Sequence, residues 1–398
     1  MSEPESSCLV ASRIVATPRI AITAIFLVQA LIFASWTAHI PQVKASLGLS
    51  DATLGTALLG APIGSIVAMI VTGWLLPRLG SKRIVQIVLI GYCLTGVGVG
   101  LAGSLPELFG ALALWGLFQG ALDVAMSTQG ITIERAMRSP IMSGLHGGWS
   151  IGAFTGAAIG AIAVANGIPL DGQLLTLGIV LLAVTGWLSL QLLPDPIAKT
   201  ASGHHAKASF AILKHPAVLT LSGIAFACML GEGAAADWSA VYLHDSLDSS
   251  AAVAGFGYAA FSLTMVTLRL GGNRLLARTS PRVILPVLTG IATIGFTLGL
   301  VIQTPVAALI GFAALGIGLA LIVPTVFSAA GALSGQHAGT AIAAVSALGW
   351  AGFVCGPPLI GHLAEWTSLP LALGIIPLLT AVIAIVTRST GVLTKTTP

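Results

Sequence analysis

The sequence predicts an all-α integral membrane protein with twelve transmembrane helices, arranged as two six-helix repeats. Its composition is too apolar for a soluble protein, its apolar stretches have bilayer-spanning length, and its two halves resemble each other. Of 398 residues, 17 are Lys or Arg and 13 are Asp or Glu, so 8% are charged, whereas 56% are hydrophobic. Soluble domains carry about 25% charged residues. With a mean hydropathy of +0.99, this composition excludes a soluble globular fold.

Twelve apolar stretches each have about the length that an α-helix needs to cross a hydrocarbon core of about 30 Å. The connections between them are short and leave no room for an extramembrane domain, so function is expected inside the membrane. The predicted spans are 20–43, 52–76, 84–103, 107–131, 142–166, 171–193, 217–243, 251–274, 283–302, 306–330, 338–362 and 369–387.

The distribution of charge predicts how the chain is oriented. A cytoplasmic N-terminus places sixteen of the seventeen Lys and Arg on the inner side and leaves only Lys44 outside, in agreement with the positive-inside rule. We therefore expect a monomeric, multi-pass protein of a bacterial-type inner membrane with both termini in the cytoplasm. The predicted segments are a cytoplasmic tail (1–19), an N-terminal six-helix bundle (20–193), a cytoplasmic linker (194–216), a C-terminal six-helix bundle (217–387) and a second cytoplasmic tail (388–398).

Net charge and motif content exclude several other classes of protein. The net charge is only +4 and the basic residues are scattered at segment ends, so no nucleic-acid surface is predicted. Cys8, Cys93, Cys228 and Cys355 form no CxxC pair, which predicts neither a disulfide framework nor a metal site. The sequence contains no GxxxxGK[ST], HExxH or GxSxG motif, so we expect no cofactor and no enzyme.

An internal repeat relates the two halves of the chain. Residues 34–38 (Ala-Ser-Trp-Thr-Ala) match residues 236–240 (Ala-Asp-Trp-Ser-Ala) at an offset of 202, and Gly148-Trp149 match Gly349-Trp350 at an offset of 201. Since each unit has an even number of helices, the two copies have the same orientation in the membrane. A substrate site is then expected between them at mid-depth.

The connection between the second and third predicted helices carries a family signature. Gly73, Arg78, Gly80 and Arg83 resemble the conserved glycines and bases of the major facilitator superfamily, and Pro77 stands where that signature has Asp. The resemblance implies the fold of that superfamily and a gating role for these four residues. The carboxylate contact that locks the inner gate in the family is not provided by residue 77.

Four further motifs are similar to the fucose-permease-like branch of this superfamily, which includes bacterial inner-membrane members. They lie at residues 39–42 (His-Ile-Pro-Gln), 120–123 (Gly-Ala-Leu-Asp), 146–150 (His-Gly-Gly-Trp-Ser) and 237–239 (Asp-Trp-Ser). Asp123 matches the helix-four carboxylate of the fucose permeases, whereas Thr37 stands where they have a helix-one Asp. Sugar specificity is therefore not implied.

Ionisable groups within membrane helices are costly and mark candidate functional sites. Asp123 shares a helical face with Trp115 and Gln119, and His146 of the next helix is expected at nearly the same depth. A carboxylate and an imidazole that meet there could exchange a proton. Glu232, between two glycines of the seventh helix, is the third candidate. We predict proton coupling through Asp123, His146 and Glu232, with packing as the alternative role of His146.

The other candidates are polar or aromatic residues at repeat-related or cavity-facing positions. His39 and Asp237, near the outer ends of the first and seventh helices, are candidates for an outer gate. The predicted substrate-binding residues are Trp36, Gln119, Asp123, Trp149, Glu232, Tyr258, Ser346 and Trp350.

These features predict a secondary active transporter, coupled to protons, that moves a small solute across the bilayer by alternating access. All seventeen Lys and Arg, including Arg269, can be assigned to tails, loops or helix ends, so the sequence predicts no fixed cation at mid-depth. A buried anion would then be unpaired, which favours a neutral or weakly cationic solute such as a sugar or polyol. The alternatives are proton-driven efflux of drugs or metabolites and a non-transporting membrane sensor.

Overall fold

The structure is a computed structural model that describes residues 3–139, 141–195, 215–333 and 338–390. Twelve helical segments within these ranges are long and apolar enough to cross a membrane, and each overlaps one predicted span. The prediction of an all-α membrane protein with twelve spans is confirmed. Most of the predicted linker 194–216 and most of the second tail 388–398 lie outside the described residues.

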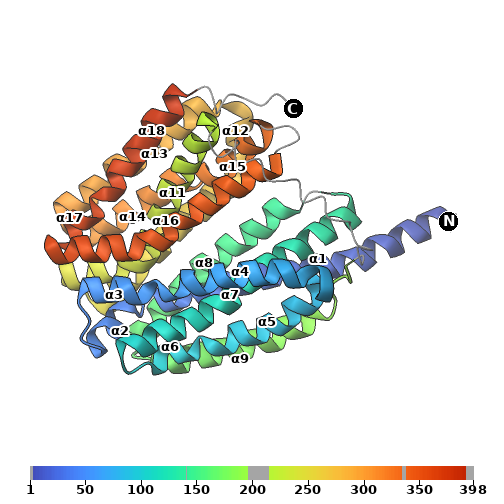
Figure 1. Cartoon of the computed structure of the whole chain (residues 1–398), viewed down its shortest axis with the longest axis horizontal. Coiled ribbons are helices and arrows are strands. Elements are labelled where there is room, and N and C mark those ends of the chain that lie inside the picture. Colours follow the sequence, from blue (N-terminus) through green and yellow to red (C-terminus); the bar gives the residue numbers. More distant parts are fainter. Residues whose placement is uncertain (1–2, 140, 196–214, 334–337, 391–398) are drawn as a thin grey trace. The chain divides into compact units, whose positions relative to one another are not determined.

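The chain divides into two compact units (Figure 1). The first unit comprises residues 1–36, 60–159 and 166–200. Its helix α4 packs on α7, α7 on α5, and α5 on α9. The helices of this unit are α1 (Glu3–Thr37), α4 (Gly60–Leu79), α5 (Ser81–Thr95), α6 (Val97–Leu101), α7 (Leu105–Met137), α8 (Met142–Ala165) and α9 (Leu170–Ser189).

The second unit comprises residues 37–59, 160–165 and 201–398. Its closest helix pairs are α11 with α16, α13 with α14, α12 with α14, and α13 with α18. Its helices are α2 (Ile40–Ser46), α3 (Asp51–Leu58), α11 (Pro216–Val241), the π-helix η1 (Tyr242–Ser246), α12 (Ala251–Arg278), α13 (Pro281–Ile302), α14 (Pro305–Leu319), α15 (Ile322–Leu333), α16 (Ala338–Trp366), α17 (Leu369–Leu373) and α18 (Ile375–Ser389).

The two units therefore differ from the two halves of the sequence in one respect. Residues 37–59 and 160–165 come from the first half of the chain but belong to the second unit. For residues 37–59 the reason is close packing of α3 on α16, where a Cβ at Gly55 would overlap the carbonyl oxygen of Pro357 and a Cβ at Gly361 would overlap that of Asp51. Only glycine permits backbones to approach so closely.

The first membrane helix differs from the predicted span 20–43 at both ends. Helix α1 begins at Glu3, within the segment predicted as a tail, and ends at Thr37. A short separate helix, α2, follows with Pro41 in its first turn. Proline is favourable in the first turn of a helix and unfavourable in its interior, which explains why the chain breaks before Pro41.

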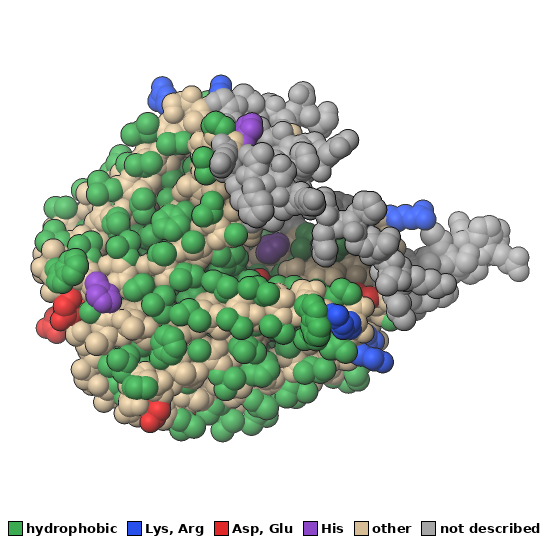
Figure 2. Space-filling model, viewed as in Figure 1, with side chains coloured by type: hydrophobic (Ala, Val, Ile, Leu, Met, Phe, Trp, Pro, Cys, Tyr) green, Lys and Arg blue, Asp and Glu red, His purple; other side chains and the backbone are tan. Residues whose placement is uncertain are grey.

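The outer faces of the helices are apolar. Ile70 and Val301 are each 72% exposed and Trp366 is 81% exposed. Figure 2 shows hydrophobic side chains over the visible surface, with most of the visible Lys, Arg, Asp and Glu at helix ends. Such a surface is stable in contact with lipid and would promote aggregation in water, so the chain is a multi-pass membrane protein.

Candidate functional site

A polar cluster within the first unit has Gln29 of α1 at its centre. Gln29 is only 2% exposed. Its Nε2 donates to the carbonyl oxygen of Gln119 at 3.3 Å, and its Oε1 accepts from Nε1 of Trp149 at 3.1 Å. Its side chain also makes a hydrogen bond with the carboxylate of Asp123. The cluster thus joins α1, α7 and α8, and it contains three of the predicted substrate-binding residues.

Glycines of α8 bring α1 close enough for this cluster to form. A Cβ at Gly152 would overlap the carbonyl oxygen of Leu27, and one at Gly156 would overlap that of Leu31. Small residues at four-residue spacing let two helix backbones approach closely. The side chains of Gln29 and Trp149 then meet directly.

An aromatic wall supports the cluster from α5 and α7. The rings of Tyr92 and Trp115 are stacked, with centroids 5.8 Å apart. The Tyr92 hydroxyl donates to the backbone oxygen of Gln29 at 2.6 Å, and Trp115 Nε1 donates to the backbone oxygen of Tyr92 at 3.1 Å. Trp115 and Tyr92 are almost completely buried, so Trp115, expected on the polar face with Asp123, has a packing role.

The partner that the structure shows for Asp123 is Gln29, a residue outside the predicted site. The hydrogen bond to the Asp123 carboxylate comes from the Gln29 side chain. His146, the expected partner, has an exposed side chain whose ring packs edge-on against Phe26 with centroids 5.5 Å apart. Equal depth on neighbouring helices does not by itself bring two side chains together, because their directions also depend on the rotation of each helix. Pairing of Asp123 with His146 therefore stays a prediction.

In the second unit, Glu232 of α11 pairs with Arg269 of α12. Arg269 Nη2 lies 3.3 Å from Glu232 Oε1, and the exposed fractions of the two side chains are 19% and 14%. Arg269 Nε also donates to the carbonyl oxygen of Ala320 at 3.2 Å. Cys228 Sγ, one turn before Glu232, is 3.7 Å from the same carboxylate oxygen. The pair is thus enclosed and held in place by further hydrogen bonds.

The sequence did not predict this pair, and its expectation that no fixed cation lies at mid-depth stays a prediction. The sequence placed Arg269 close to the inner end of its helix, but α12 continues to Arg278, more than two turns further. The long Arg side chain then reaches Glu232. Because the two charges cancel, the Glu232–Arg269 pair adds no net charge to the second unit.

The remaining predicted substrate-binding residues are divided between the two units. Trp36 and Tyr258 are 2% and 6% exposed. Ser346 is half-buried, as is Trp350, whose ring packs against Phe353 with centroids 5.5 Å apart. Trp36 belongs to the first unit and the other three to the second.

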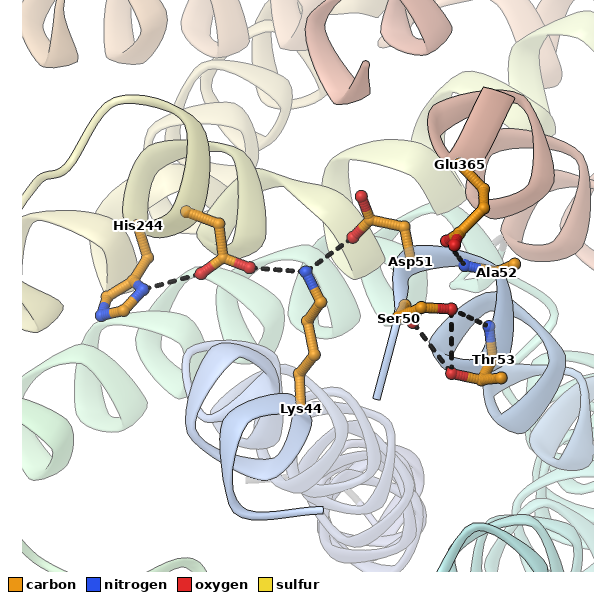
Figure 3. Close-up of polar contacts among 8 residues, drawn as sticks. Lys44, Ser50, Asp51, Ala52, Thr53, His244 and Glu365 are labelled. Carbon is orange, nitrogen blue, oxygen red and sulfur yellow. Dashed lines mark hydrogen bonds and ion pairs between the residues drawn. The ribbon is translucent and has the colours of Figure 1, made fainter. Parts of the chain in front are cut away.

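The predicted outer-gate residues both belong to the second unit. His39 is 3% exposed and precedes α2, and Asp237 of α11 is half-buried. A gating role for these two residues stays a prediction. Charged contacts shown by the structure centre on Lys44, the basic residue that the sequence placed outside. Lys44 Nζ lies 2.6 Å from Asp51 Oδ1 and 2.6 Å from Asp245 Oδ2 (Figure 3).

The Lys44 cluster joins α2, the N-terminus of α3 and η1. Burial lowers the pKa of Lys44, but hydrogen bonds to Asp245 and Asp51 and the charges of both carboxylates outweigh it and raise the pKa above its usual value. His244 Nδ1 lies 2.8 Å from the second oxygen of Asp245. Lys44 is therefore a protonated bridge between two acidic residues from distant parts of the chain.

We expect Lys44→Gln to lower the thermal stability of the second unit. The substitution removes the cation shared by Asp51 and Asp245, and for a partly exposed bridge the cost is about 1 kcal/mol. Melting curves at low and high salt measure it: the gap between wild type and Lys44→Gln should narrow as salt screens the charges. Arg83→Gln removes an exposed basic residue of the first unit and controls for net charge. A gap that is independent of salt contradicts an electrostatic origin.

The signature connection between α4 and α5 is held by a carboxylate that the sequence did not reveal. Asp195, just after the sixth membrane helix, accepts hydrogen bonds from the backbone N–H of Ser81, from Ser81 Oγ at 2.8 Å and from Thr132 Oγ1 at 3.1 Å. Gly80 has φ +76°, and a Cβ there would lie 2.9 Å from Asp195 Oδ2. Asp195 thus supplies a carboxylate at the signature connection, where Pro77 replaces the acid of the family pattern.

The other signature residues lie at the surface. Arg78 donates to the carbonyl oxygen of Trp74 at 2.6 Å and stacks 3.7 Å above the Trp74 ring. Arg83 is exposed, and a Cβ at Gly73 would meet no atom within 4 Å. Of the four predicted gating residues, Gly80 is therefore the one whose identity the described contacts require.

We expect Asp195→Asn to destabilise the first unit by about 1–2 kcal/mol. The substitution removes a negative charge from the N-terminus of α5 and a charged acceptor from three donors. Denaturant titration of the purified protein measures the loss. Asp171→Asn removes an acid from the first turn of α9 and should cost less. Equal losses in the two variants would assign no special role to Asp195.

Comparison with known proteins gives the family. Residues 21–337 and 221–396 match the profile of the Major Facilitator Superfamily. The chain belongs to this superfamily. It is 32% identical over 372 residues to the uncharacterized transporter y4wD of Sinorhizobium fredii, covering 93% of this chain and 97% of that protein. It is also 31% identical to the membrane protein MosC of Rhizobium meliloti, covering 89% of this chain and 86% of MosC.

Solved structures of the superfamily confirm the fold. A mutant of the nucleoside transporter NupG aligns with a TM-score of 0.75 at 15% identity, over 93% of this chain and 99% of NupG. A variant of the Escherichia coli fucose:proton symporter FucP aligns with a TM-score of 0.59 at 17% identity, over 93% of this chain and 98% of FucP. Family and fold together make the chain a membrane transporter and not an enzyme.

Proposed function

We propose that the chain is a secondary active transporter that couples proton movement to the transport of a small neutral or weakly cationic solute by alternating access. The observation that carries the proposal is the environment of Asp123. Asp123 is half-buried, and the hydrogen-bond partner of its carboxylate, Gln29, is a neutral amide. An amide stabilises either protonation state, so Asp123 can bind and release a proton during a transport cycle.

Glu232 is the second candidate for the proton site, and its contacts favour a different role. Arg269 forms a charge-assisted pair with it, so a change in the protonation of Glu232 would also break an ion pair. Asp123 has no comparable cationic partner among the contacts described above. We therefore assign proton exchange to Asp123 ahead of Glu232 and His146.

The expected solute follows from the charges of both units. Arg269 is already neutralised by Glu232, so an anionic solute would find no spare cation there. Gln119, Trp149 and Asp123 offer hydrogen-bonding groups and an aromatic face, which suit a hydroxylated solute or a weak cation. The neighbours NupG and FucP are named for nucleosides and for fucose, solutes of this chemical kind.

The proposed orientation has both termini in the cytoplasm of a bacterial-type inner membrane, as the charge distribution predicts. In that orientation the Lys44 cluster lies at the outer end of the second unit. Its ion pairs tie residues 37–59 to η1 within the second unit. We propose that the cluster is part of the outer gate, close to the predicted gate residues His39 and Asp237 along the chain.

A ligand screen followed by flux measurements tests the function. Purified protein is screened by thermal shift against neutral sugars, polyols, nucleosides and organic cations, because a ligand that binds the folded form raises its stability. Matched neutral and anionic analogues of each stabilising compound are then compared at pH 7.5, and the best compound is followed in reconstituted vesicles. Tighter binding of the anionic analogues contradicts the proposed solute class. Binding without flux supports a sensor.

Proton-driven efflux is the alternative direction of transport. The same Asp123 site serves import and export, since only the sign of the coupling differs. Vesicles with an imposed pH gradient of either sign distinguish the two: uptake together with protons indicates symport, and uptake against the proton flow indicates exchange.

A further inference from the structure

Gln29 makes contacts that none of the predicted site residues makes. Its amide has two donors on Nε2 and an acceptor on Oε1, and the structure uses both kinds of group in different directions. The donor side faces α7, where the backbone oxygen of Gln119 and the carboxylate of Asp123 accept. The acceptor side faces α8, where Trp149 donates. One buried amide therefore connects an ionisable group on one helix to an aromatic ring on another.

The orientation of this amide depends on its partners. Trp149 Nε1 can only donate, so it can bond to Gln29 only when Oε1 faces α8. Oε1 faces α8 when Nε2 faces the acceptors on α7. The charged form of Asp123 is the stronger of those acceptors, since a hydrogen bond to an ionised group is roughly twice as strong as one between neutral groups.

We propose that Gln29 transmits the protonation state of Asp123 to the Trp149 ring, and that it is a positioning residue of the transport cycle. This inference rests on the proposed role of Asp123 as the proton site. When Asp123 is charged, it holds the Gln29 amide in the orientation that accepts from Trp149. When Asp123 is protonated, its hydrogen bond to the Gln29 amide weakens, the amide can turn, and the hydrogen bond from Trp149 Nε1 is lost. Proton binding to Asp123 on α7 then frees the ring of Trp149 on α8, which we propose contacts the solute.

Other ionisable groups on the neighbouring helices must be distinguished from Asp123. His146 lies on α8, one turn before Trp149, and titrates near pH 6.5 when unperturbed. Tyr92 and Cys93 lie on α5, and their unperturbed pKa values are about 10 and about 8.5. On α4 the ionisable side chain is Arg78, which is exposed and bonded to Trp74. Of these groups, His146 is the one whose ordinary titration overlaps a physiological pH range.

The test follows Trp149 and Asp123 separately and needs no ligand. The fluorescence of Trp149 is the difference between the emission of wild type and that of Trp149→Phe, recorded from pH 4 to pH 9 in detergent. Protonation of Asp123 is measured by pH-difference infrared spectra, as the carboxyl band that is present in wild type and absent in Asp123→Asn. In wild type, the Trp149 emission is expected to shift with the same midpoint as the carboxyl band. We call the proposed transmission from Asp123 through Gln29 to Trp149 the relay. A carboxyl band without any shift of the Trp149 emission overturns it.

Gln29→Met separates the relay from the proton site, because it keeps the volume of the side chain and removes both kinds of hydrogen-bonding group. We expect the carboxyl band to remain and the Trp149 shift to be lost, as measured against a Gln29→Met/Trp149→Phe reference. Gln173→Met is the matched control, since Gln173 is another buried amide that donates to α1, at the Ser35 oxygen 3.0 Å away. It should keep both signals, as should His146→Gln.

The outcomes distinguish failure of the relay from failure of the proposed function. A Trp149 shift that persists in Gln29→Met overturns the relay but leaves Asp123 as a proton site. A shift lost in His146→Gln assigns the pH response to the imidazole and also overturns the relay. A pH-difference spectrum that Asp123→Asn leaves unchanged removes Asp123 as the proton site, and the proposed coupling fails with it.

Discussion

We expect Asp123→Asn to abolish the accumulation of solute driven by a pH gradient while leaving counterflow intact. Counterflow requires only binding and exchange of solute on the two sides of the membrane, and an Asn side chain can still hydrogen-bond to Gln29. Net accumulation requires a group that gains and loses a proton in each cycle. Asn cannot do so, and the variant should bring the solute only to equal concentrations inside and outside.

Reconstituted vesicles with an imposed pH gradient measure this effect, with the solute taken from the ligand screen. Asp171→Asn, at the start of α9, is the control for the loss of one carboxylate in the same unit. It should retain accumulation. Undiminished accumulation in Asp123→Asn would move the proton site elsewhere, and Glu232→Gln would then be the variant to compare.

The fold was predictable from sequence because the bilayer fixes the length of each element. About 20 consecutive apolar residues are needed for each crossing, so hydropathy alone located all twelve spans. The ends of the helices were less predictable, because they depend on local chemistry. Helix α1 ends at Thr37 because Pro41 starts a new helix, and α12 runs to Arg278, four residues beyond the predicted end.

The membership of the two units was not visible in the sequence. Residues 37–59 pack with the second half of the chain because Gly55 and Gly361 permit close contact between α3 and α16. Glycines are common throughout this sequence, 48 in all, so no single glycine indicates which helix packs against it. The repeat correctly suggested a duplicated six-helix design, but packing between the repeats is a tertiary property.

The site was predictable only where charge marked it. Asp123 and Glu232 stood out because ionisable residues are rare in membrane helices. Gln29 carries no charge, and its side chain contacts three residues on two other helices. A lone amide in an apolar span was nevertheless a usable signal. Asp195 was hidden by its place within the predicted linker 194–216, where an acidic residue is ordinary. Arg269 was recognised, but its pairing with Glu232 was not predicted.

Arg269→Leu should be among the most destabilising single substitutions in the second unit. It leaves the Glu232 carboxylate enclosed without its partner, and removing one member of a buried ion pair costs about 3–5 kcal/mol. Denaturant titration of the purified protein measures this loss. The Cys228 thiol that remains near Glu232 is a weak donor and cannot replace a guanidinium.

The double variant Arg269→Leu/Glu232→Gln tests whether the cost comes from the unpaired charge. Replacing both members of a buried pair is often nearly neutral, because the desolvation cost of two ions disappears with their attraction. The double variant should therefore recover most of the stability that Arg269→Leu loses. Glu232→Gln alone should cost less than Arg269→Leu, because Arg269 keeps its bond to the carbonyl oxygen of Ala320. A double variant no more stable than Arg269→Leu would mean that Arg269 acts through packing and not through its charge. In that case Glu232 does not serve to neutralise Arg269, and an anionic solute becomes the better expectation.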